Sequence, residues 1–120
     1  LGEHVDAMEN EQGAYEIYRD LGEGRSESIA LQSMASIYTD ARQYERAVEY
    51  FQNALERYQD PSLDLAAHNN LANALTQLER YDEAALSFEQ ARTLANTMGS
   101  AILEARVLNN RSKMQREAAD

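Results

Sequence analysis

The chain alternates between stretches whose apolar side chains recur every three to four residues and short polar breaks. Leu31, Met34, Ala35 and Tyr38 stand at i, i+3, i+4 and i+7, which is the core-facing stripe of an amphipathic helix. Glycine marks the breaks near residues 22 and 99, and Pro61 marks another, as expected at helix ends and helix starts. The pattern predicts six helices, over residues 3–21, 26–40, 44–58, 62–78, 81–97 and 101–117.

The same helical pattern returns at a fixed distance along the chain. "QYERAVEYFQNAL", which starts at Gln43, overlays "RYDEAALSFEQAR", which starts at Arg80, with a shift of 37 residues and no gap. Residues 4–22 overlay residues 81–99 two units further on, and residues 104–112 overlay residues 64–72 with a shift of 40. Self-similarity at a fixed period is the signature of a repeat array. The sequence therefore predicts one array over residues 1–120, with units at 1–22, 25–59, 62–98 and 101–120.

Alanine occupies the core-facing positions that the repeats share. Ala47 matches Ala84 and Ala54 matches Ala91, while Phe51 stands one turn from both alanines of its helix. Two helices paired in a hairpin, with another helix stacked on them, approach closely where they cross. A side chain larger than a methyl group would push the backbones apart there, and the aromatic ring fills the space beside the crossing. The alanines are therefore predicted to set the packing geometry.

These positions resemble the tetratricopeptide repeat family, whose unit has a small residue and a tyrosine in its first helix and small–x3–aromatic–x2–small in its second. The matching residues are Ala35, Tyr38, Ala47, Phe51 and Ala54 in one unit, and Ala72, Ala84, Phe88 and Ala91 in the next, where Leu75 replaces the tyrosine. Units of 37 to 40 residues are similar to an extended variant of the 34-residue repeat. The resemblance implies an all-α, right-handed superhelical array of stacked antiparallel hairpins that binds proteins.

Composition agrees with this class and excludes others. β-Branched residues are sparse, which favours helices, and the absence of cysteine excludes disulfides and thiolate sites. A formal net charge of −10 disfavours nucleic acid as a partner, and no apolar run is long enough to span a membrane. We expect a cytoplasmic protein. The chain begins with Leu1, which suggests a piece of something longer.

No catalytic motif is present, so the sequence predicts a non-enzyme without a cofactor. The glycines near residue 22 follow no strand and precede no lysine, unlike a phosphate-binding loop. His4 and His68 are far apart in sequence, which disfavours a metal pair, and His68 stands where the family places a helix-packing residue. Runs of carboxylates are typical of solvated helix faces.

Polar residues on the first helix of each pair are the candidate binding residues. The resemblance implies that first helices line the concave surface of the superhelix, where amides can grip the backbone of an extended peptide. This interpretation gives a peptide-binding set of Gln32, Ser36, Asn69, Asn70, Asn73, Arg106, Asn109, Asn110 and Lys113. The alternative is structural: asparagine is a poor helix former, and several of these amides could bond to neighbouring helices.

The terminal helices leave a second function open. We expect the first helix to leave four residues partly bare: Val5, Met8, Ile17 and Tyr18. Self-association through that end would cover them, and truncation of a longer array would explain why they are bare. At the other end, Arg111 and Gln115 resemble a polar cap. The main interpretation is a module that binds a protein or peptide partner. The alternative is an oligomerising or sensor segment of a bacterial signalling protein.

Overall fold

The computed structural model describes residues 2–120 and confirms the predicted all-α class. Across those residues it contains six helices and no strand. The helices are α1 (Gly2–Leu21), α2 (Gly24–Asp40), α3 (Tyr44–Arg57), α4 (Pro61–Gln77), α5 (Tyr81–Thr97) and α6 (Ala101–Ala119). Each begins and ends within two residues of its predicted bounds. The spacing of apolar residues and breaks therefore located every element.

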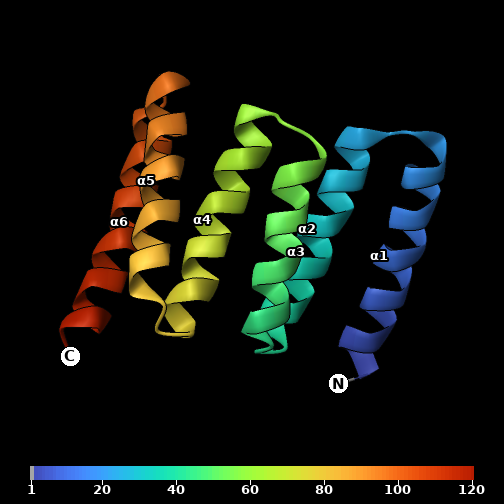
Figure 1. Ribbon diagram of the computed structural model, residues 1–120, viewed down its shortest axis with the longest axis horizontal. Helices are drawn as coiled ribbons and strands as arrows, with labels where there is room; N and C mark the ends of the chain where they lie inside the picture. Colours follow the sequence, from blue (N-terminus) through green and yellow to red (C-terminus); the bar gives the residue numbers. More distant parts are fainter. Residues whose placement is uncertain (1) are drawn as a thin grey trace. The chain divides into compact units, whose positions relative to one another are not determined.

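The helices form two compact units, Leu1–Gln59 and Asp60–Asp120. Within the first unit, α1 packs on α2 and α2 on α3, each antiparallel to the next (Figure 1). Within the second, α4 packs on α5 and α5 on α6 in the same way, and α6 also contacts α4. The division falls after Gln59, between α3 and α4, and the extent of each repeat stays a prediction. Consecutive antiparallel packing is the arrangement expected of a helical-hairpin repeat.

The turns between helices show the repeat in their backbone angles. Arg42 and Glu79, which are 37 residues apart, close the turns of the two hairpins with φ of 61° and 59°. Gly22 and Gly99 end α1 and α5 with φ of 72° and 70°. This left-handed conformation is inexpensive for glycine and strained for other residues. Equivalent positions thus adopt equivalent conformations even where the residue type differs.

Helices α4 and α6 begin at side-chain caps. The Asp60 carboxylate accepts hydrogen bonds from the backbone N–H groups of Ser62 and Leu63, at 3.0 and 3.1 Å. The Ser100 hydroxyl accepts one from the N–H of Leu103 at 3.2 Å. Each cap satisfies backbone donors that have no partner within the helix. Pro61, whose ring fixes φ and which has no N–H to leave unpaired, suits the first position of α4.

The alanines that the repeats share are buried. Ala47 and Ala84 are fully buried, and so are Ala54 and Ala91, which stand seven residues later in the same two helices. The Ser28 hydroxyl of α2 donates a hydrogen bond to the backbone carbonyl of Ala54 in α3, at 3.0 Å. A side chain on one helix can reach the backbone of another only where the residue between them is small. The structure thus agrees with the crossing role predicted for the alanines.

Helix α1 is the least covered of the six. It has no buried residue, and Val5 and Ile17 are 57% and 60% exposed, as expected from the sequence. Met8 and Tyr18 are half-buried, which also agrees with the partial exposure expected for them. Met8 packs against the core cluster formed by Leu31, Met34 and Ala54.

Replacing Ala84 by leucine should destabilise the fold. Three additional heavy atoms at a fully buried helix crossing force the backbones apart, and such overpacking costs about 1–3 kcal/mol. The matched change Ala105→Leu on the exposed side of α6 should alter the free energy of unfolding by about 0.5 kcal/mol or less. Thermal and urea unfolding of dilute protein measure both. Equal stabilities for the two variants would contradict the crossing role of Ala84.

Candidate functional site

Seven of the nine candidate residues lie on α4 and α6 of the second unit. Asn69, Asn70 and Asn73 stand within one helical turn of one another on α4. On α6 the members are Arg106, Asn109, Asn110 and Lys113, spaced so that they share one face. The Asn110 Nδ2 group donates a hydrogen bond to Asn69 Oδ1 at 3.2 Å. This bond brings the polar stretches of α4 and α6 together.

The seven residues divide by exposure into a connecting pair and an accessible set. Asn69 and Asn110 are half-buried and satisfy each other, which is the structural alternative raised by the sequence. Asn70 is also half-buried. The exposed members are Asn73, Arg106, Asn109 and Lys113. A ligand can therefore reach two amides and two cationic groups on these helices without displacing the pair beneath.

Gln32 and Ser36 lie on α2, in the first unit. Ser36 is exposed and Gln32 is half-buried. Their participation in one site with the residues of α4 and α6 stays a prediction.

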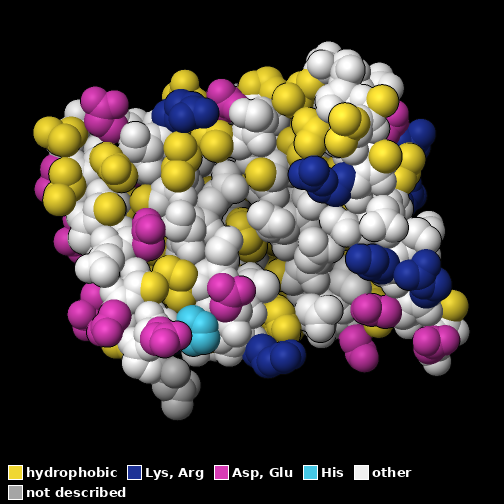
Figure 2. Space-filling model, turned by 180° about the vertical axis from the view of Figure 1, so that it is seen from behind, with side chains coloured by type: hydrophobic (Ala, Val, Ile, Leu, Met, Phe, Trp, Pro, Cys, Tyr) yellow, Lys and Arg dark blue, Asp and Glu magenta, His cyan; other side chains and the backbone are white. Residues whose placement is uncertain are grey.

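Local charge at this face differs from the charge of the whole chain. Helix α6 carries four basic and two acidic side chains, although the chain has a formal net charge of −10. Dark blue basic side chains gather over α6 in Figure 2. Arg106 and Lys113 are both exposed on this helix. The face therefore provides a local positive potential on an acidic protein.

His68 is a packed histidine, in agreement with the sequence. It is half-buried on α4, one turn after Asp64, and its Nδ1 is buried without a hydrogen-bond partner among residues 2–120. Burial lowers the pKa of His68, and the nearby Asp64 carboxylate opposes this change. Burial also raises the pKa of Asp64. The environment therefore favours the neutral imidazole.

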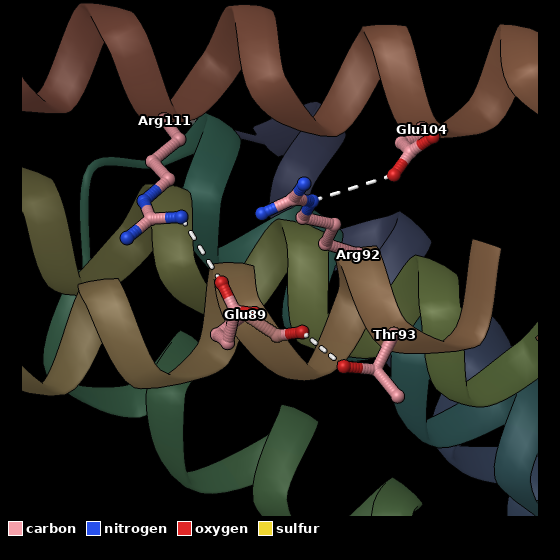
Figure 3. A network of polar contacts seen from close by, with 5 residues as sticks. All are labelled: Glu89, Arg92, Thr93, Glu104 and Arg111. Carbon is pink, nitrogen blue, oxygen red and sulfur yellow. Dashed lines mark hydrogen bonds and ion pairs between the residues drawn. The ribbon is translucent and has the colours of Figure 1, made fainter. Parts of the chain in front are cut away.

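A polar network between α5 and α6 was not predicted. Glu89 accepts a hydrogen bond from Arg111 Nη1 at 3.0 Å, and Glu104 accepts one from Arg92 Nε at 3.3 Å (Figure 3). The Thr93 hydroxyl donates to the backbone carbonyl of Glu89. A polar hollow of about 330 Å³ lies beside these groups. Opposite charges on adjacent helices could have indicated the pairs, but only once the register between α5 and α6 was known.

Arg111 differs from the solvent-facing cap that the sequence indicated. Its side chain is half-buried and pairs with Glu89, so it connects α6 to α5. Its Nε is also buried and has no hydrogen-bond partner within the described part of the chain. An arginine can connect two helices while half-buried, because its aliphatic stem packs against them and its guanidinium reaches a carboxylate. Gln115, the other expected cap residue, is exposed.

Among residues 2–120, no cluster of three or more histidine or carboxylate side chains could hold a metal ion. No helix in the same range is both long and apolar enough to cross a membrane.

Paired antiparallel helices with small residues at their crossings and exposed polar residues on their first helices define a helical-repeat protein. The family model for the tetratricopeptide repeat matches residues 33–101, which is more than half of the chain. The chain therefore belongs to the tetratricopeptide repeat family. No curated protein and no solved structure matches it.

The stability of the fold should decrease below pH 6.5 because of His68. Its pKa is lowered from 6.5 in the folded state, so the unfolded chain binds a proton there that the folded chain resists. Stability is then lost as the pH falls through the usual pKa of histidine. Melting temperatures at pH 7 and pH 5 measure the effect. His68→Gln should show a smaller drop than the parent. Equal drops in the two proteins would contradict the assignment.

Proposed function

We propose that this chain is a protein–protein interaction module that holds an extended acidic peptide segment against the exposed faces of α4 and α6. Tetratricopeptide repeats are generally protein–protein interaction modules, and this chain belongs to that family. In this role the chain is a scaffold that needs neither a cofactor nor a metal.

One observation carries the proposal: exposed amides stand beside exposed cations on two helices that are held together. The hydrogen bond between Asn69 and Asn110 fixes α4 and α6 at this face. Asn73 and Asn109 then project to solvent, although asparagine is among the poorer residues for the middle of a helix. An amide can donate to a peptide carbonyl and accept from a peptide N–H. Two of them suit recognition of an extended backbone.

Charge supports an acidic partner. Arg106 and Lys113 flank Asn109 on α6, and both are exposed. A guanidinium or ammonium group bonds strongly to a carboxylate, whether it belongs to a side chain or to the C-terminus of a peptide. Because these contacts lie at the surface, added salt should weaken binding modestly rather than abolish it.

The double substitution Asn73→Ala, Asn109→Ala should weaken binding while preserving the fold. Each amide contributes about 0.5–1.5 kcal/mol when it pairs with a peptide, so affinity should fall about 5- to 150-fold. Helix propensity should rise by about 0.5 kcal/mol per site. The probe is an array of synthetic peptides of varied acidity, prepared with free and with amidated C-termini. Selected peptides are then titrated by fluorescence anisotropy, and unfolding is followed by circular dichroism.

The double substitution Asn53→Ala, Asn96→Ala is the matched control. Both asparagines are exposed, but they lie on α3 and α5, the second helix of each pair, and not on the proposed binding face. It should bind like the parent. Asn69→Ala tests the connecting pair separately and should lower stability, since it leaves the half-buried Asn110 amide unpaired. Normal binding by the Asn73, Asn109 variant would move the site to another face. An array that selects no acidic peptide would contradict the proposed partner.

The same charge distribution predicts no binding to duplex nucleic acid. With a formal net charge of −10, phosphate backbones are repelled over most of the surface, and the three exposed cations on α6, Arg106, Lys113 and Arg116, release few counterions. Gel retardation with duplex DNA and duplex RNA at moderate ionic strength should show no shift. A retarded band that weakens steeply with added salt would overturn this prediction.

A further inference from the structure

One side of α1 is less buried than the equivalent side of α5. Residues 4–22 overlay residues 81–99, so each residue of α1 has a counterpart in α5. Ala84, Ser87 and Ala91 are buried in α5. We define the α1 seam by the matching residues and their continuation along the helix, which are Ala7, Asn10, Ala14, Ile17 and Leu21. Every member of the α1 seam is half-buried or exposed.

Helix α6 shows the complementary difference from α4. Residues of α6 overlay those of α4 with a shift of 40, and Leu65, Ala72 and Leu75 are buried in α4. We define the α6 seam by the matching stripe, which is Ala105, Leu108, Ser112 and Gln115. Its members are exposed, except for the half-buried Ser112. The two surfaces that pack together within a hairpin are therefore both present on this chain, one on α1 and one on α6, and neither is packed as its counterpart in α5 or α4 is.

The hairpin of α2 and α3 shows how two such seams meet. Ser28 of α2 donates its hydrogen bond to the carbonyl of Ala54 in α3. In the repeat alignment Ser28 corresponds to Ala105 of α6, and Ala54 corresponds to Ala14 of α1. A contact of the same kind between the two seams would place Ala105 against Ala14. Both residues are small enough for the helices to approach closely.

The charges of α1 and α6 are also complementary. Helix α1 carries six acidic side chains and one arginine, and α6 carries four basic and two acidic side chains. In Figure 2, acidic side chains are prominent over α1 and basic ones over α6. Opposite potentials favour α1 against α6, whereas two α1 helices would repel each other. The pairing of unlike helices is thereby preferred to a symmetric contact.

We propose that the α1 seam of one copy of this chain packs on the α6 seam of a second copy, as α3 packs on α2. This contact does not depend on the peptide site. Because it joins different surfaces of the two copies, each copy keeps one free seam and association can continue head to tail. Ser112 and Gln115 make the α6 seam more polar than its counterpart in α4, so the contact is weak and reversible.

Sedimentation velocity of the 120-residue chain tests the proposal between about 0.01 and 1 mM, the range in which weak contacts form. The weight-average mass should rise with concentration at about 20 mM salt and should return toward the monomer at about 500 mM salt, because opposite charges are then screened. A chain that remains monomeric at 1 mM would overturn the proposal and would leave these seams to another partner.

Two seam variants test which surfaces meet. Ile17→Arg places a cation opposite the basic α6 of the second copy. Leu108→Asp places an anion opposite the acidic α1 of the second copy. Both residues are exposed, so each variant should retain the fold. Each variant alone should be monomeric. Their equimolar mixture should associate again, because the first supplies an intact α6 seam and the second an intact α1 seam.

Leu86→Arg is the control, since Leu86 is an exposed leucine on α5 that belongs to neither seam. It should associate like the parent. Self-association of either seam variant alone would indicate a symmetric contact and overturn the proposal. A mixture that stays monomeric while the parent associates would overturn it as well.

Discussion

Full burial of alanine between packed helices is the constraint on which the rest of this structure depends. Ala47, Ala54, Ala84 and Ala91 are all fully buried, so a larger side chain there would force the helices apart. Phe51 and Phe88, buried beside them, supply the apolar area that the alanines do not. The small residues therefore determine the distance between helices, and the large ones supply most of the hydrophobic stabilisation. Because the same residues recur after 37 positions, the same geometry recurs with them.

The helices and their bounds could be predicted because they depend on local patterns. Apolar spacing, capping residues and glycine at left-handed turns all act within a few residues, and each can be read without a partner. The burial of α1 depends on another factor. Ala7 and Ala14 match the fully buried Ala84 and Ala91 in sequence, yet they are half-buried because exposure is decided by whichever helix lies opposite. Periodicity identifies an apolar face but does not identify its cover.

Less of the candidate site than of the fold could be predicted, because the role of a polar side chain also depends on the helix that lies opposite it. Sequence identified the polar positions of α4 and α6, but not that Asn69 and Asn110 would bond to each other. Nor did it identify the pair of Glu89 and Arg111, which needs the register between α5 and α6. A polar side chain on a helix surface has the same pattern whether it serves a neighbouring helix or a ligand. Only the contact separates Asn69, which serves α6, from the exposed Asn73.

This separation explains how one fold can carry different partners. The alanine faces determine how helices pair, so a change there alters the whole unit. Exposed positions such as Asn73, Asn109 and Lys113 can change with little effect on packing, because surface substitutions usually shift stability by less than about 0.5 kcal/mol. A hairpin face that is uncovered retains the geometry that pairs helices within a repeat. It can therefore bind another helix of the same type, and the charge around it selects which one.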